Sequence, residues 1–291
     1  MVIPQLIGGL GNQMFQYAAG RALALRKKTT CKLDISGFAS YGLRQFELQR
    51  IFHCPVEVAT ESDVRHVLGW YASPAIQRIA ARLRMPFLRS RELVVEPHFN
   101  YWPGINDVPQ DCFLVGYWQS EKYFQDAVQE IRADFAFKTP MSDRNAEIAR
   151  QINGVNAVSL HVRRGDYVSN PHTNSVHGLC SLDYYRAAIR HISERIERPH
   201  LFIFSDDMAW VKDQLKLGLP CQYVEHNQGD ESYNDMRLMS LCRHHIIANS
   251  SFSWWGAWLN PNPHKIVVAP QNWFANNSDV GDLFPREWVT L

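Results

Sequence analysis

The sequence has no stretch long and apolar enough to cross a membrane, since no run of about 20 apolar residues occurs in its 291 residues. Its first apolar stretch is interrupted by Pro4, Gly8 and Gly9 and lacks a basic lead-in, so no signal peptide is predicted. The six cysteines include no Cys-x-x-Cys pair, which favours a reduced, cytosolic setting. The sequence also lacks Asp-x-Asp and any ligand spacing typical of zinc, so we expect no bound metal.

Net charge is likewise almost absent, because 30 basic and 29 acidic residues leave a formal charge of +1. Such a balance gives no overall field for nucleic acid, so we expect no nucleic-acid partner, and an anionic ligand must be held by a local site. With 46% hydrophobic residues, the chain can bury a large core, as one large domain or as two of about 150 residues each.

The second half alternates between short apolar runs and segments with helical periodicity. The predicted strands are 157–162, 201–204, 222–224, 245–248 and 265–269. The predicted helices between them are 182–198, 208–217, 233–243 and 253–259. This alternation is typical of a doubly wound, mostly parallel sheet, whose ligands bind beyond the carboxyl ends of the strands.

The first half begins in the same way and then becomes irregular. The predicted elements are a strand at 2–7, a glycine-rich loop, a helix at 14–27 and a strand at 31–34. A linker near 138–140 and a crossing helix near 143–152 follow. We therefore expect an α/β protein with one domain at 1–140, carrying irregular insertions, and a second domain at 141–291.

Two arginines and a carboxylate follow the apolar run 157–160, where a buried strand is expected to end. His161 and Arg163 share one face of an extended strand, because side chains alternate along it. The planar guanidinium of Arg163 suits phosphate oxygens, while Asp166 is close enough in sequence to hold Arg164 or the turn. A structural ion pair at a strand end is the alternative interpretation.

Two other segments offer backbone N–H groups to an anion. Ser250 and Ser251 follow a strand and precede a helix, so their hydroxyls and the helix N-terminus can form a phosphate cradle, or the serines simply cap the helix. The loop from Gly8 to Gly11 also joins a strand to a helix. It lacks the third glycine of a dinucleotide fingerprint and is equally consistent with a tight turn.

Four blocks, at 8–18, 116–124, 161–167 and 249–259, resemble bacterial α-1,2-fucosyltransferases of glycosyltransferase family 11 in order and spacing. The resemblance covers essentially the whole chain and implies a GT-B fold, with two facing Rossmann-like domains and a cleft between them. It also implies inverting transfer of L-fucose from GDP-β-L-fucose to the 2-hydroxyl of a terminal galactose, on a cell-surface or O-antigen glycan. Another GDP-sugar transferase and a non-catalytic glycan-binding protein are the alternatives.

The resemblance assigns GDP-fucose to the second domain. An aspartate at the spacing of Asp235 accepts from the guanine amino edge, with an exposed helix carboxylate as the alternative, and His161 would complete the base pocket. Asp206 and Asp207 would hold ribose or base, or cap the following helix. The expected donor-binding residues are His161, Arg164, Asp206, Asp207, Asp235, Ser250, Ser251, Phe252, Gly9 and Gly11.

The expected chemistry needs no metal or other cofactor. Arg163, the two serines and the helix start place positive potential where the pyrophosphate leaving group gains negative charge. The group that receives the proton of the galactose hydroxyl stays open between Asp166, Asn12 acting by positioning, and a phosphate oxygen of the donor. Asn12 is also the residue of the glycine-rich loop that the resemblance brings to the donor.

The acceptor is expected to be a galactose-terminated, lipid-linked oligosaccharide that meets Tyr117, Trp118 and Gln119, although a tryptophan in a strand usually packs in the core. Segment 73–91 interleaves five arginines with apolar residues. Bacterial enzymes of this type are expected to work at the inner leaflet, so a basic amphipathic helix here would hold a cytoplasmic protein against anionic lipid. A solvated helix is the alternative.

Overall fold

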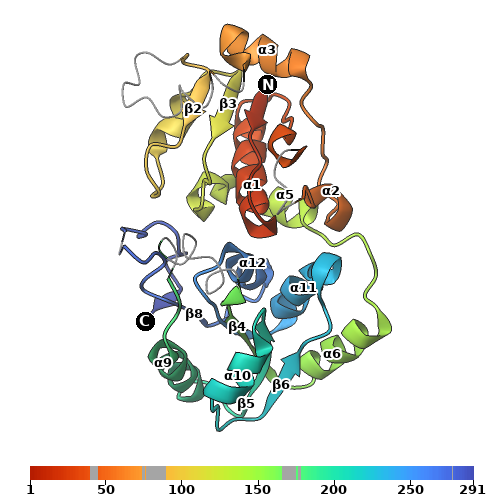
Figure 1. The fold of residues 1–291 in the computed structure, drawn as a ribbon, viewed down its shortest axis with the longest axis vertical. Helices are drawn as coiled ribbons and strands as arrows, with labels where there is room; N and C mark the ends of the chain where they lie inside the picture. Colours follow the sequence, from red (N-terminus) through yellow and green to blue (C-terminus); the bar gives the residue numbers. More distant parts are fainter. Residues whose placement is uncertain (40–44, 74–75, 77–89, 166–174, 176–177, 277) are drawn as a thin grey trace. The chain divides into compact units, whose positions relative to one another are not determined.

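The computed structural model describes the chain from Met1 to Leu291 except for residues 40–44, 74–75, 77–89, 166–174, 176–177 and 277. It divides into two compact units (Figure 1). The first comprises residues 1–138 and 281–283, and the second comprises 139–280 and 284–291. Among the described residues, no helix is long and apolar enough to cross a membrane.

The first unit is built on a three-stranded parallel sheet with the strand order β1-β3-β2. Its strands are β1 (Val2–Pro4), β2 (Leu93–Val95) and β3 (Cys112–Val115). The main helix, α1 (Leu10–Arg26), starts just after β1 and is buried along most of its length. Segment 31–34 forms only isolated bridges instead of the predicted strand: Cys31 pairs with Val2 of β1, Asp34 with Gln5 and Leu33 with Val58.

Shorter elements complete this unit. The α-helices are α2 (Leu48–Ile51), α3 (Glu61–Leu68) and α5 (Val128–Asp134), and the 3-10 turns are η1 (Ser36–Ala39), η2 (Gly69–Ala72), η4 (Pro103–Asp107), η5 (Glu121–Tyr123) and η6 (Gln125–Ala127). Helix α3 starts at a capping box, in which Thr60 and Asp63 each bond the other's backbone N–H. Local signals of this kind, more than a long periodic pattern, organise this irregular half.

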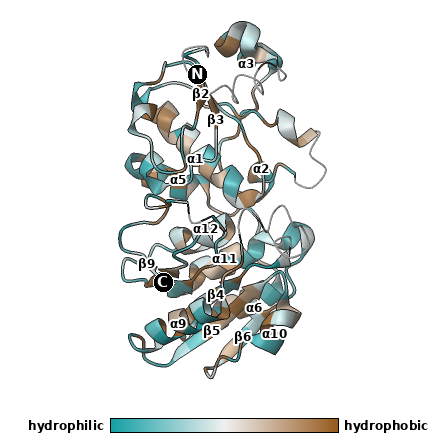
Figure 2. Ribbon diagram, turned by 60° about the vertical axis from the view of Figure 1, so that its left-hand side comes forward, coloured by the Kyte–Doolittle hydropathy of each residue, from teal (hydrophilic) through white to brown (hydrophobic). Residues whose placement is uncertain are grey.

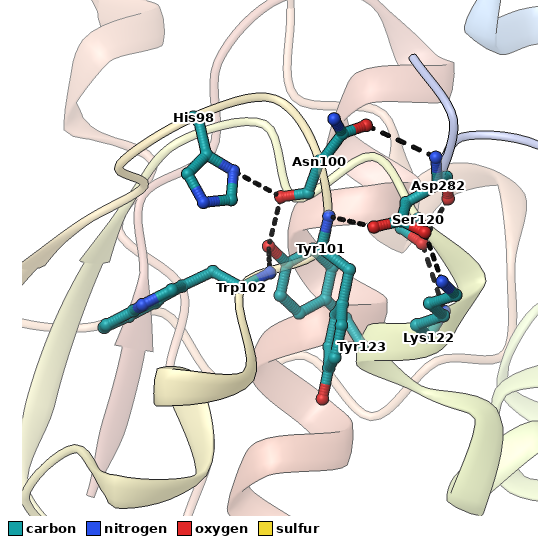
Figure 3. Close-up of polar contacts among 8 residues, drawn as sticks. All are labelled: His98, Asn100, Tyr101, Trp102, Ser120, Lys122, Tyr123 and Asp282. Carbon is teal, nitrogen blue, oxygen red and sulfur yellow. Dashed lines mark hydrogen bonds and ion pairs between the residues drawn. The ribbon is translucent and has the colours of Figure 1, made fainter. Parts of the chain in front are cut away.

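Residues 281–283 join the first unit although they come from the end of the chain. Asp282 is the anchor (Figure 3). Its carboxylate pairs with the Lys122 ammonium and accepts the backbone N–H of Tyr101, while its backbone carbonyl accepts the Ser120 hydroxyl and its own N–H donates to Asn100. An expected boundary at residue 140 puts this segment in the second domain, because local pattern carries no information about such long-range bonds.

The second unit contains a six-stranded, all-parallel sheet with the order β6-β5-β4-β7-β8-β9. Its strands are β4 (Asn156–Val162), β5 (Pro199–Ser205), β6 (Cys221–Val224), β7 (His244–Ile246), β8 (Val267–Ala269) and β9 (Val289–Thr290). Numbered within the unit, this order is 3-2-1-4-5-6, the Rossmann arrangement. The order reverses between β4 and β7.

Helices cover both faces of this sheet. They are α6 (Asp143–Asn153), α9 (Leu182–Ser193), α10 (Met208–Gln214), α11 (Tyr233–Leu241) and α12 (Ser251–Leu259), with the turn η7 (Gly229–Glu231). Val158, Leu160 and Val162 pack against α9 and α10. Ala157 lies in a second cluster with residues of α6 and α11. Figure 2 shows the hydrophobic colouring along β4 and β5 that this two-sided burial requires.

Most predicted elements of the second unit occur within a few residues of their expected bounds. The main exception is the helix expected at 182–198, since α9 ends at Ser193. Pro199 follows Arg198, which adopts a positive φ of 47°, and the residue before a proline is disfavoured in a helix. Helix α12 starts two residues earlier than expected because Ser250 occupies its N-cap position.

Candidate functional site

The carboxyl ends of β4 and β7 mark the point where the strand order of the second unit reverses. Open parallel sheets bind ligands in the crevice beyond this point. His161, Arg163 and Arg164 lie at the end of β4, and Ser250 follows β7. The sheet topology therefore assembles segments that are almost ninety residues apart in the sequence.

Arg163 lies just beyond β4, where its Nη1 atom is 2.9 Å from the Oδ2 atom of Asp206. About a quarter of each side chain is exposed. An arginine carries five N–H donors in a planar fork, so the pair with Asp206 orients the guanidinium without using all its donors. The second Asp206 oxygen accepts the backbone N–H of Arg164 at 2.8 Å. A single carboxylate thus fixes both arginines of the motif.

Arg164 is held from the side of α10. Its Nε atom donates to Asp207 at 3.2 Å, and its guanidinium carbon lies 3.9 Å from the centre of the Trp210 ring. Asp207 also caps α10 by accepting the Trp210 N–H. Asp207 therefore both caps α10 and holds Arg164, whereas Asp166 lies outside the described residues.

His161 is 5% exposed, and no hydrogen-bond partner reaches its Nδ1 atom within the described part of the chain. Burial lowers its pKa to about 4, Asp206 opposes this effect, and Arg163 adds to it. The ring is therefore neutral at pH 7. It lies 5.9 Å, centre to centre, from the Phe252 ring in the first turn of α12. A buried ring nitrogen without a partner costs about 1–3 kcal/mol, which a ligand hydrogen bond can recover.

The N-terminus of α12 offers a second polar feature at the same sheet edge. Ser250 is the N-cap residue, but its side chain makes no capping hydrogen bond, and only 9% of the residue is exposed. Ser253 bonds back to the carbonyls of Ala248 and Ser250. The positive end of a helix dipole and a buried hydroxyl therefore adjoin the arginines of β4. Trp254, Trp255 and Trp258 are buried and pack against one another in the core.

Asp235 is not an exposed helix carboxylate. Its Oδ1 atom accepts a hydrogen bond from the Asn227 amide at 2.8 Å, and Asn227 in turn exchanges two bonds with the buried Asn145. His226 contacts the same Asn145 amide. Burial raises the pKa of Asp235 to about 7, against the lowering effect of Asn227. This amide network orients one partly buried carboxylate whose protonation changes near neutral pH.

In the first unit, the glycine-rich loop precedes α1. Gly8 has a φ of +79°, and a Cβ atom on it would lie 2.8 Å from the Asn12 amide nitrogen. Its left-handed backbone conformation therefore requires glycine, and the Asn12 side chain packs closely against it. Gly9 occupies the N-cap position, and Gly11 is buried in the first turn. The side chain of Asn12 accepts a hydrogen bond from Gln119 at 2.9 Å.

The block around Gln119 divides its aromatic rings between surface and core. Tyr117 is 43% exposed, whereas Trp118 is fully buried and meets Tyr123 edge-to-face. The Trp118 ring therefore cannot stack on a sugar in this conformation, and the core alternative is correct for it. Trp118 also has a positive φ of 55°, an uncommon conformation for a bulky residue.

Sequence reasoning missed three residues that organise these sites. Trp210 stacks on Arg164, and Asn227 orients Asp235. Glu96 accepts the backbone N–H groups of Tyr117 and Trp118. Glu96 directly follows a short apolar run, a position like that of the arginines after the run 157–160. Most of the basic segment 73–91 lies outside the described residues, including Arg78, Arg82, Arg84 and Arg89.

Comparisons with known proteins identify a glycosyltransferase family. The sequence profile of the family described as "Glycosyl transferase family 11" matches residues 104–291. The Escherichia coli alpha-1,2-colitosyltransferase is 34% identical over 100% of this chain and 99% of its own length. The Escherichia coli O-antigen biosynthesis glycosyltransferase WbnK is 36% identical over 98% of this chain and 99% of its own length.

A solved structure, that of the NodZ alpha-1,6-fucosyltransferase soaked with GDP-fucose, is similar in fold, with a TM-score of 0.53 and 17% identity. The likeness covers 89% of this chain and 92% of that chain. The fold is accordingly the α/β GT-B fold of such transferases. From the match of the family profile over most of the sequence and the two full-length relatives above 30% identity, this chain belongs to glycosyltransferase family 11.

Proposed function

We propose that this chain transfers L-fucose, with inversion, from GDP-β-L-fucose to the 2-hydroxyl of a terminal galactose and so forms an α-1,2 linkage. The observation that carries the proposal is the polar edge beyond β4 and β7. There Arg163, the unpartnered Nδ1 of His161 and the N-terminus of α12 lie where a Rossmann sheet binds a nucleotide. The four sequence blocks that resemble α-1,2-fucosyltransferases supply the sugar and the linkage.

In the proposed complex, Arg163 and the α12 N-terminus bind the pyrophosphate. Arg163 stabilises the charge that grows on the leaving group as the glycosidic bond breaks, and Ser250 and Ser251 donate hydroxyl hydrogen bonds. Arg164 acts mainly by holding the strand end. We infer that two guanidiniums and a helix N-terminus provide enough positive potential for the reaction to proceed without a divalent metal.

The base pocket is proposed to lie over Asp235, His161 and Phe252. Because Asn227 donates to Oδ1 of Asp235, the carboxylate is oriented before the ligand arrives. A carboxylate can accept both the N1–H and the 2-amino group of guanine, which selects guanine over other bases. In this complex Asp206 orients Arg163 and does not bind the ribose directly.

On the acceptor side, we propose that Tyr117 stacks on the galactoside and that Asn12 and Gln119 bond its hydroxyls. Tyr117 is exposed enough to do so, and the Gln119–Asn12 hydrogen bond fixes both amides. The name of the WbnK relative supports an O-antigen type of acceptor. We propose further that this glycan is lipid-linked at the inner face of the plasma membrane. The enzyme would then be cytoplasmic and contact that membrane peripherally.

A second donor is favoured by one specific observation, the 34% identity to an alpha-1,2-colitosyltransferase. Colitose lacks the 3-hydroxyl of fucose, so the two donors differ by a single polar group. The purified protein should be incubated with GDP-fucose or GDP-colitose and a galactoside, and initial rates compared. A kcat/KM higher for GDP-fucose supports the proposal, whereas a preference for GDP-colitose would replace fucose by colitose as the donor sugar.

A further inference from the structure

Glu96 lies at the carboxyl edge of the sheet in the first unit, directly after β2 and beside the end of β3. Each of its carboxylate oxygens accepts one backbone N–H group. The Tyr117 N–H is 2.7 Å from Oε2, and the Trp118 N–H is 3.0 Å from Oε1. Two successive amides of the 116–124 block therefore converge on one carboxylate.

The backbone of the turn that contacts Glu96 is locally strained. A Cβ atom on Gly116 would lie 2.4 Å from the Cβ and 2.7 Å from Oε2 of Glu96, so only glycine fits at that position. Trp118 adopts a positive φ of 55°. Strain of this kind in a non-glycine residue clusters at functional sites, where the surrounding structure has to enforce it. The turn thus presents Tyr117 to solvent while it holds the Glu96 carboxylate in place.

Burial raises the pKa of Glu96 to about 7, although both backbone hydrogen bonds act in the opposite direction. Among the described residues, Tyr123 lies close enough to interact with this carboxylate; burial raises the pKa of Tyr123 first, and Glu96, Tyr101 and Asp282 add to the rise. Phenols and carboxyls carry no positive charge that would favour the ionised form of Glu96. The carboxylate consequently has the basicity that suits proton transfer at neutral pH.

We propose that Glu96 is the catalytic base, which receives the proton of the acceptor hydroxyl. This inference rests on the proposed function. As the hydroxyl oxygen bonds to C1 of fucose, the C1–O bond to the pyrophosphate breaks and GDP leaves with the electron pair. The hydroxyl proton passes to a carboxylate oxygen of Glu96. Tyr117, whose N–H bonds this carboxylate, and Gln119, two residues further along and bonded to Asn12 of α1, would hold the acceptor sugar.

Proton transfer and orientation of the acceptor hydroxyl are then carried out by different residues, Glu96 and Asn12. An asparagine amide is not basic, so Asn12 can orient a hydroxyl but cannot take its proton. Each carboxylate oxygen of Glu96 has two lone pairs, and its backbone bond uses one of them. Each oxygen thus keeps one lone pair that its backbone bond does not use.

The test compares Glu96→Gln with Glu57→Gln, an exposed glutamate of the same unit. Each protein is assayed at saturating GDP-fucose with a galactoside and, separately, with azide, an anionic nucleophile that has no proton to lose. We expect Glu96→Gln to lower kcat for the galactoside at least about a hundredfold, the range of a general base. The rate of α-fucosyl azide formation should stay within about threefold of wild type. Glu57→Gln should match wild type in both assays.

The pH profile provides a readout that a structural role would not produce. With saturating donor, galactoside transfer by the wild type should fall as the pH drops through about 7, because the proton on Glu96 blocks the base. Azide transfer should lack this limb. Glu96→Asp, which keeps a shorter carboxylate, should retain azide transfer and lose most galactoside transfer. This second variant keeps the test decisive if Glu96→Gln fails to fold.

Three outcomes would overturn the assignment. These are an equal loss of both reactions in a folded variant, a rise in acceptor KM with unchanged kcat, and an unchanged galactoside rate. The wild type is the control for the proposed function. If it used GDP-fucose in neither assay, the proposed donor would be wrong, and the same pair of assays with GDP-colitose would then test Glu96.

Discussion

Replacement of Asp235 by asparagine is a precise test of guanine recognition, because the structure shows how the variant side chain would be oriented. Asn227 donates to Oδ1 of Asp235 at 2.8 Å, so the oxygen of the new amide should take this position. The amide NH2 then replaces Oδ2 and faces the guanine edge with a donor where an acceptor is needed. The backbone of α11 and the bond from Asn227 should be unchanged.

The expected magnitude follows from the two ligands compared. GDP offers Asp235 the N1–H and the 2-amino group, whereas IDP offers the N1–H alone. A hydrogen bond to a charged group contributes about 1.5–3 kcal/mol, so the preference for GDP over IDP should fall by roughly tenfold to a hundredfold in Asp235→Asn. Calorimetry with both nucleotides at pH 8 measures this coupling. Asp213→Asn, an exposed aspartate in α10, is the matched control.

The raised pKa of Asp235 also predicts the direction in which nucleotide preference and stability change with pH. Because burial raises the pKa of Asp235 to about 7, the wild-type preference for GDP should increase as the pH rises from 6 to 8, and the variant should show no such change. A folded-state pKa above the ordinary value of 3.8 also means that stability from the protonated carboxyl is lost as pH rises through about 7. Without ligand, Asp235→Asn should therefore be more stable than wild type at pH 8. Equal losses of GDP and IDP affinity would refute the guanine assignment.

The remaining predictions concern the pyrophosphate site. Arg163→Ala should lower turnover about a hundredfold, as expected for a transition-state contact, with an unchanged thermal midpoint. Arg186→Ala, which replaces an exposed arginine of α9, should be neutral. More than about a tenth of wild-type activity in Arg163→Ala would contradict its role. Ser250→Ala should raise the KM for the donor. It should not bring the loss of about 1 kcal/mol of stability that removal of a helix cap causes, since the Ser250 side chain makes no capping bond. Initial rates measure the KM and urea unfolding measures the stability, and a stability loss with unchanged KM would make Ser250 structural. Activity should persist in EDTA, and an absolute requirement for added Mn²⁺ or Mg²⁺ in a chelated preparation would refute metal-independent transfer.

The sheet of the second unit could be predicted from sequence because its signals are local. Its long strands β4 and β5 are mainly apolar runs followed by polar residues, and right-handed parallel connections bring these polar ends to one edge. The arginines of the β4 motif and Ser250 were found in this way, whereas Asp235, on helix α11, was assigned from the family resemblance. What the pattern could not give was their partners, since Asp206 and Trp210 are more than forty residues from the arginines that they hold.

The first unit was less predictable because its strands are three or four residues long and its order depends on long-range bonds. The position of Glu96 depends on the positive φ of Trp118 and on the absence of a side chain at Gly116, neither of which changes hydrophobic periodicity. The position of the Trp118 ring was unpredictable for the same reason. From the sequence, Trp118 is expected to contact the acceptor sugar together with Tyr117. The left-handed backbone turns its ring into the core instead.

The most direct test of the central claim is the structure of the reaction product. The purified protein should be incubated with GDP-β-L-fucose and a β-galactoside, and the linkage and anomeric configuration of the product determined by NMR. The account predicts a single fucose in α linkage to the 2-hydroxyl of galactose, with GDP released in equal amount. A β linkage, attachment to another hydroxyl, or transfer that occurs with GDP-colitose but not with GDP-fucose would contradict it.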